Sequence, residues 1–145
     1  MINIHFIVNP IAGVGKNSFS KQFLQSYFEV DKYTISIKPS GFNGQAIELT
    51  KESIVEKADI IVACGGDGTI NEVASTLVDI TIPLGIVPIG SGNGLASNLN
   101  IPKNIKKALR IIKNRECITI DVGCVNQRYF FSNTGFGFDA SVIKN

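Results

Sequence analysis

One segment constrains the fold of this chain more than any other, because in it an apolar strand enters a glycine-rich turn and continues as a helix. Residues 60–64 are uniformly apolar, as in a strand buried on both faces, and three glycines and Asp67 fill the next four positions. Glycine lets the backbone approach an anion closely, and the N–H groups that open a helix are unpaired donors. The turn is therefore predicted to hold phosphate. Asp67 would repel that phosphate unless a cation lay between them, which predicts Mg²⁺.

Strand and helix patterns alternate along most of the chain. Strands are predicted at residues 4–9, 33–38, 59–64 and 84–89, and helices at residues 18–28, 46–55, 71–78 and 103–113. This order predicts an α/β fold, a three-layer α-β-α arrangement around a mostly parallel sheet. Ligands of such sheets bind beyond the carboxyl ends of the strands, where three glycine-containing turns of this chain fall. The turns are thus expected to form one site.

The alternation of strand and helix patterns ends near residue 117. Apolar and polar residues alternate over 117–124, and Asn126-Gln127 then turns the chain into Tyr129-Phe130-Phe131, which predicts a β-hairpin. An isolated hairpin is marginally stable in water. We therefore expect these strands to be poorly ordered, or to pair with a second copy of the chain in a homodimer.

Composition narrows the class of protein further. The chain has 145 residues, 44% of them hydrophobic, which is enough for a core, and a net charge of +2 that is small and dispersed. Such a charge indicates an ordinary solvated surface, and neither a nucleic-acid partner nor a strongly anionic membrane is expected. Three cysteines without metal-ligand spacing favour a reduced, cytoplasmic location. No apolar run approaches the roughly 18 residues of a membrane-spanning helix, and no signal peptide is expected, because the first residues predict a strand.

Three blocks of the sequence together resemble a known family. The run Gly65-Gly66-Asp67-Gly68-Thr69, followed by Asn71-Glu72-Val73, resembles the nucleotide-binding signature of the diacylglycerol kinase and sphingosine kinase superfamily of lipid kinases. The strand from Pro83 and its turn Gly90-Ser91-Gly92-Asn93 resemble a second family block, and Asn9-Pro10 with Gly13 a third. Because the blocks occur in the family order and span nearly the whole chain, the resemblance is strong.

The resemblance implies a site for ATP and Mg²⁺. Asp67 is the predicted catalytic and metal-holding residue. The residues predicted to bind the nucleotide are Asn9, Pro10, Gly13, Ser40, Gly65, Gly66, Gly68, Thr69, Asn71, Glu72, Ser91, Gly92 and Asn93. The segment around Ser40 and Gly44 departs from the family pattern, because Gln45 stands where a histidine is usual. In the family, Asp139 would contact the polar head group of the lipid substrate.

The resemblance also implies a division of the chain. Residues 1–116 would form the nucleotide-binding α/β domain, and residues 117–145 would begin a truncated, β-rich lipid-binding domain. The complete protein would transfer the γ-phosphate of ATP to a lipid hydroxyl, as a peripheral enzyme at the membrane surface. The family's general base would lie beyond residue 145, so this chain alone is expected to be inactive.

Several alternatives compete with these expectations. The segment around Gly15-Lys16 lacks the spacing of a Walker A loop and of a dinucleotide fingerprint. NAD kinases share the Gly-Gly-Asp-Gly-Thr turn, and a nucleotide-binding module without chemistry would need the same glycines. Three residues also have purely structural interpretations. Asp67 could be a helix cap, Glu72 could interact favourably with the dipole of its own helix, and Lys16 could be simply solvated. His5 is predicted to be structural.

Overall fold

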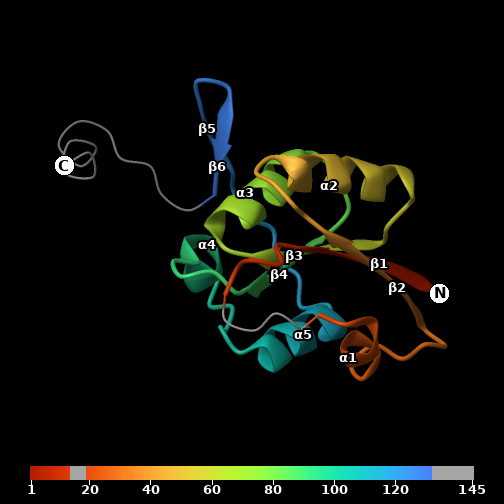
Figure 1. Ribbon diagram of the computed structural model, residues 1–145. Helices are drawn as coiled ribbons and strands as arrows, with labels where there is room; N and C mark the ends of the chain where they lie inside the picture. Colours follow the sequence, from red (N-terminus) through yellow and green to blue (C-terminus); the bar gives the residue numbers. More distant parts are fainter. Residues whose placement is uncertain (14–18, 132–145) are drawn as a thin grey trace.

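The sheet carries four parallel strands. In the computed structural model, which describes residues 1–13 and 19–131, the strand order is β2-β1-β3-β4 (Figure 1). The bounds are β1 Ile2–Val8, β2 Tyr33–Pro39, β3 Ile60–Gly65 and β4 Leu84–Pro88. Each strand begins and ends within two residues of its predicted position, and every neighbouring pair is parallel. The predicted parallel sheet is therefore confirmed.

Helices cover both faces of this sheet, as Figure 1 shows. One face carries α1 Lys21–Gln25 and α5 Ile105–Asn114; the other carries α2 Gln45–Val55, α3 Asp67–Thr76 and α4 Gly94–Asn98. The three-layer arrangement is confirmed. The first helix is shorter than predicted, because the chain turns at Ser26 and Phe28 reaches the core from that turn. The third begins four residues early, so the glycine turn is itself the start of α3.

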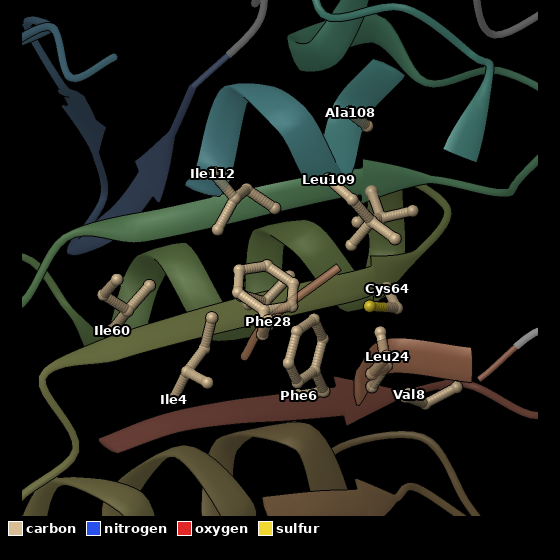
Figure 2. Close-up of a cluster of buried hydrophobic side chains, with 12 residues drawn as sticks. Ile4, Phe6, Val8, Leu24, Phe28, Ile60, Cys64, Ala108, Leu109 and Ile112 are labelled. Atoms are coloured by element: carbon tan, nitrogen blue, oxygen red, sulfur yellow. The ribbon is translucent and has the colours of Figure 1, made fainter. Parts of the chain in front are cut away.

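The central strand β3 explains why residues 60–64 are uniformly apolar. Ile60, Val62 and Cys64 pack toward α1 and α5, whereas Ile61 and Ala63 pack toward α2 and α3. Figure 2 shows the first of these clusters, in which Phe6 and Phe28 meet edge to face with ring centroids 5.8 Å apart. Complete burial raises the pKa of the Cys64 thiol, so this cysteine is a small apolar core residue.

The order of the strands creates a crevice at the carboxyl edge of the sheet. After β1 the chain passes to one side of that strand to form β2, and β3 then lies on the other side of β1. The chain leaves β1 toward α1 on one face and leaves β3 toward α3 on the opposite face (Figure 1). Adjacent strands whose connections diverge in this way open a crevice between their carboxyl ends. The turns after β1 and β3 border this crevice.

A hairpin follows the α/β layers. Strands β5 Gly123–Val125 and β6 Arg128–Phe130 are antiparallel, and Asn126 and Gln127 have positive φ angles of 49° and 65°. Positive φ at both loop residues is typical of a two-residue type I′ turn, so the predicted hairpin is confirmed. Residues 117–122 are not in a strand, and that part of the prediction was wrong. The division near residue 116 and the pairing with a second copy stay predictions.

Within the two described ranges, no helix has both the length and the apolar character that a bilayer span requires.

A buried histidine gives the fold a testable pH dependence. His5 is almost wholly buried on β1, with Nδ1 3.6 Å from Glu56 Oε2 and Nε2 3.1 Å from Asn3 Oδ1. Burial, and secondarily the nearby Lys38 ammonium, lowers the pKa of His5 below 6.5, while Glu56 opposes this shift. His5 therefore takes up a proton near pH 6.5 in the unfolded chain, but only at a lower pH in the folded chain. The contribution of His5 to stability is complete above pH 6.5 and falls as the pH drops toward the folded-state pKa.

We expect the free energy of unfolding to decrease between pH 7 and pH 5.5, with a slope from this group of at most about 1.4 kcal/mol per pH unit. His5→Gln removes the titrating group and should flatten the profile in that window. Urea denaturation at several pH values measures both proteins. Equal slopes for the parent and His5→Gln would show that other groups control stability there.

Candidate functional site

Three turns enclose an open cleft of about 740 Å³ at the carboxyl edge of the sheet. They follow β1, β3 and β4, and they belong to the three blocks singled out in the sequence. The residues that line the cleft are Asn9, Ala12, Gly13, Gly66, Asp67, Gly68, Thr69, Ile89, Gly90, Ser91 and Gly92. Three segments distant in sequence therefore meet at one site, as their positions at strand ends predicted.

Glycines allow these turns to touch backbone to backbone. A Cβ atom on Gly90 would overlap the Cα of Gly66, and one on Gly13, whose φ is +75°, would overlap the carbonyl oxygen of Ile89. No other residue type fits such contacts without movement of the backbone. The cleft is therefore built by the close approach of the β4 turn to the turns after β3 and β1.

The turn after β3 presents unpaired donors to the cleft. Gly66 is the N-cap of α3, with an extended backbone and no side-chain capping bond. The first helical hydrogen bond runs from the Ile70 N–H to the Gly66 carbonyl (3.0 Å). Among the described residues, the N–H groups of Asp67, Gly68 and Thr69 have no hydrogen-bond partner. A Cβ on Gly68 would meet nothing within 4 Å. The start of α3 thus offers an anion three donors and unobstructed space.

The carboxylate of Asp67 links this turn to the next. Asp67 Oδ1 accepts a 2.7 Å hydrogen bond from the N–H of Gly94, the first residue of α4, and Oδ2 lies close to Gly92. Asp67 is exposed and is the only carboxylate in the cleft lining, while no cluster of three potential metal-ligating side chains exists among residues 1–13 and 19–131. One carboxylate can hold Mg²⁺ only together with oxygens from a ligand and water.

Two predicted residues at the cleft are buried, although Thr69 still contributes to the lining. Thr69 is buried and its hydroxyl packs against Gly65, where a Cβ would be 2.7 Å from Thr69 Oγ1. Asn93 is buried with φ +55°; its Oδ1 accepts from the Gly90 N–H (3.1 Å) and its Nδ2 donates to the Gly90 carbonyl (2.6 Å). Asn93 is the N-cap residue of α4, but its side chain makes no capping bond, and the Gly94 N–H donates to Asp67 instead. Its amide shapes the β4 turn.

The turn after β1 holds its own shape. Asn9 Oδ1 accepts a hydrogen bond from the Ile11 N–H (3.1 Å), and the Asn9 N–H donates to the Cys64 carbonyl (2.9 Å). This arrangement is an Asx turn, which fixes the backbone around Pro10. Asn9 and Gly13 line the cleft, and Pro10 does not.

Four further predicted residues lie outside the cleft lining, and one of them is Gly65 at the end of β3. Ser40 follows β2 and its hydroxyl donates weakly to the Val8 carbonyl (3.4 Å), and Asn71 is exposed on α3. Glu72 Oε1 accepts a 3.0 Å hydrogen bond from the Gly44 N–H, at the N-terminus of α2. Glu72 therefore joins α3 to α2. The two carboxylates of α3 each bond the start of a neighbouring helix, and neither case could be read from its local sequence.

Comparison with known proteins identifies this arrangement. The family described as "Diacylglycerol kinase catalytic domain" matches residues 3–125 of the chain. The chain belongs to this family. The lipid-kinase resemblance of its three glycine blocks is thereby confirmed, and the cleft is formed by those same blocks.

Relatives of this diacylglycerol kinase catalytic domain are about twice its length. It is 37% identical over 142 residues to a diacylglycerol kinase from Bacillus subtilis, covering 94% of this chain and 46% of that protein. It is 34% identical over 144 residues to "Probable lipid kinase YegS-like" from Pectobacterium atrosepticum, covering 93% of this chain and 48% of that protein. A crystal structure of a diacylglycerol kinase from Bacillus anthracis superposes with a TM-score of 0.70 and 28% identity, covering 88% of this chain and 47% of that one. The chain thus spans about half the length of these relatives.

Three residues that line the cleft of this diacylglycerol kinase catalytic domain were not predicted from the sequence, namely Ala12, Ile89 and Gly90. Gly90 had a signal, since it opens the second glycine block. Ala12 and Ile89 had no such signal, because a small or apolar side chain in a turn does not indicate a binding site. Asp139 and Lys16 lie outside the described residues, so the proposed contact of Asp139 with a lipid head group stays a prediction.

Proposed function

We propose that this chain is the nucleotide-binding half of an ATP-dependent lipid kinase, which transfers the γ-phosphate of ATP to a lipid hydroxyl. The observation that carries the proposal is the unpaired N-terminus of α3, which opens into the cleft at Gly68 beside Asp67. Phosphoryl transfer depends mainly on positioning and on neutralising phosphate charge. Both are tasks for a rigid set of backbone donors.

The phosphates of ATP are the part of the substrate that this cleft suits. The N–H groups of residues 67–69 would donate to phosphate oxygens, and the turn containing Ser91 and Gly92 would flank them from the opposite side. The single carboxylate of Asp67 fits Mg²⁺ bound jointly by protein, phosphate and water, which is the usual mode for this ion with nucleotides. When bound, Mg²⁺ would neutralise part of the phosphate charge. Asp67 would hold it with the oxygen that Gly94 leaves free.

The lipid is proposed to bind elsewhere in the protein. The relatives are about twice as long, so we place the general base and most of the lipid site in the part of the protein that corresponds to their other half. The chain of 145 residues should therefore bind nucleotide without appreciable turnover. We place the complete enzyme at the cytoplasmic surface of a membrane, where a lipid hydroxyl is accessible.

Transfer of labelled γ-phosphate tests this function on the complete protein. Diacylglycerol, sphingosine, ceramide and NAD would be offered as acceptors, and we expect a lipid product. A labelled NAD product would instead support an NAD kinase, and no product with any acceptor, despite Mg·ATP binding, would support a module without chemistry. Rapid lipid phosphorylation by residues 1–145 alone would contradict the placement of the general base.

Asp67→Asn separates the two roles that the structure allows for this residue. Asparagine keeps the Oδ1 acceptor for the Gly94 N–H but lacks the charge that attracts a metal ion. We expect the affinity for Mg·ATP, measured by calorimetry, to fall by roughly tenfold, with a melting temperature within about 2 °C of the parent.

Asp67→Ala is the matched control, because it removes both the charge and the hydrogen bond to α4. It should lose the same affinity and also about 1 kcal/mol of stability. If Asp67→Asn binds Mg·ATP as the parent does, with the same dependence on magnesium, then Asp67 serves only as a cap.

A further inference from the structure

The positive charge of this protein is concentrated on one helix. Of the fourteen basic residues, six fall between positions 103 and 115, and no acidic residue occurs from 80 to 115. The eight basic residues elsewhere are outnumbered by the twelve acidic ones. The net charge of +2 therefore averages over two unlike regions, and the dispersed distribution expected from that small value does not describe the folded chain.

Helix α5 presents three of these six charges on its outer face. Ala108, Leu109 and Ile112 are buried and point toward the sheet, as Figure 2 shows. Lys106, Lys107 and Arg110 lie on the opposite side of the helix, and all three are exposed. Among the described residues these three side chains form no ion pair, whereas Lys113 pairs with Glu29 at 3.0 Å. We call Lys106, Lys107 and Arg110 the cationic face of α5.

The position of α5 relates this face to the cleft. Ile112, near the end of α5, packs against Gly85 at the start of β4, and Figure 2 shows Ala108 and Leu109 displaced toward the Cys64 end of the sheet, so the helix runs antiparallel to the strands. The beginning of α5, with Lys106 and Lys107, therefore lies toward the carboxyl edge of the sheet, which is the edge that bears the cleft. The opposite face of the sheet carries α3, which has two acidic residues and no basic one (Figure 1).

We infer that the cationic face of α5 binds the anionic surface of a membrane, an inference that rests on the proposed function for the choice of partner. Lysine and arginine near such a surface each add attraction, and a charge gradient across the molecule would also orient it. Three unpaired cations on a rigid helix next to the edge that binds nucleotide would hold the cleft close to a lipid substrate. The attraction is electrostatic and sensitive to salt.

Vesicle co-sedimentation tests the inference on the full chain, with vesicles of phosphatidylcholine containing about a third phosphatidylglycerol, and pure phosphatidylcholine for comparison. The variant Lys106→Gln, Lys107→Gln, Arg110→Gln should bind the anionic vesicles on the order of a hundredfold more weakly, about fivefold per charge removed. The matched control is Lys21→Gln, Lys51→Gln, Lys57→Gln, which removes three exposed charges from elsewhere and should weaken binding by less than about threefold.

Several outcomes would overturn the inference. Equal losses in the two triple variants would assign the effect to net charge, and unchanged binding by the α5 variant would exclude the helix. The parent binding pure phosphatidylcholine equally well, or binding neither vesicle, would also reject it. Binding to polyglutamate but not to anionic vesicles would indicate an acidic protein partner instead.

The two proposals can fail separately. The α5 variant is expected to bind Mg·ATP like the parent, because none of its altered residues lines the cleft. Asp67→Asn is expected to lose Mg·ATP affinity and keep vesicle binding. Loss of vesicle binding alone would therefore bear on α5, and absence of nucleotide binding alone on the proposed function.

Discussion

Gly68→Ala is expected to reduce the affinity for Mg·ATP at least a hundredfold while leaving the melting temperature unchanged or slightly higher. A Cβ at this position meets no protein atom within 4 Å, and alanine is the better helix residue by roughly 1 kcal/mol. The same Cβ would occupy space in the cleft next to the unpaired N–H groups of α3. Displacing a phosphate from two such donors would forfeit about 3 kcal/mol, which corresponds to a hundredfold or more. Calorimetric titration with Mg·ATP and thermal unfolding measure the two quantities.

Gly41→Ala supplies the matched control. Gly41 is also an exposed glycine with room for a Cβ, whose nearest neighbour would be Gln45 Oε1 at an ordinary 3.5 Å, but it lies outside the cleft lining. It should change neither nucleotide affinity nor stability appreciably. If Gly68→Ala binds Mg·ATP with parental affinity, the phosphates do not lie against the start of α3, and the nucleotide site must be sought elsewhere.

The layers of the fold were predictable because the burial of each strand determines its pattern of apolar residues. Residues 60–64 are apolar without interruption since β3 packs helices on both of its faces, and residues 33–37 alternate since β2 is an edge strand, only partly buried. The positions of the glycine turns followed from the same reasoning, because parallel strands bring their carboxyl ends to one edge. Residues 117–122 alternate in the same way but lack a neighbouring strand in the described residues, and alternation alone does not make a sheet.

The hydrogen-bond partners of the polar side chains could not be predicted from the sequence. Asp67 and Glu72 are five positions apart on α3, yet one bonds Gly94 and the other Gly44, which are 27 and 28 residues away. These partners depend on which helices flank α3 in space. Asn93 was similarly recognised as important, but its buried amide bonds Gly90 and so faces the turn backbone. Residue type and strand-end position can identify a site, whereas the contacts within it require the tertiary structure.

Gly90→Ala should destabilise the fold strongly. Its Cβ would overlap the Cα of Gly66, so the turn after β4 would have to move away from the turn after β3. The bonds between Gly90 and the Asn93 amide hold that turn from the other side and resist the movement. Backbone overpacking of this kind costs about 3 kcal/mol, which for a chain of this length lowers the melting temperature by roughly 10 °C. Urea denaturation gives the free energy directly.

Gly85→Ala tests whether backbone contact, rather than buried glycine as such, is responsible. Gly85 is buried within β4, but the three atoms nearest to its Cβ would all belong to side chains, namely Ile112 Cδ1, Ile112 Cγ1 and Val62 Cγ2, at 3.0 Å. Such atoms can shift by a few tenths of an ångström, so this variant should lose about 1 kcal/mol. Mg·ATP affinity should fall for Gly90→Ala even under conditions where it is folded, because the two turns proposed to flank the phosphates would be displaced, and should persist for Gly85→Ala. Equal destabilisation by the two substitutions would mean that the β4 turn can move aside freely, and the close approach of Gly66 and Gly90 would then not be what fixes the shape of the cleft.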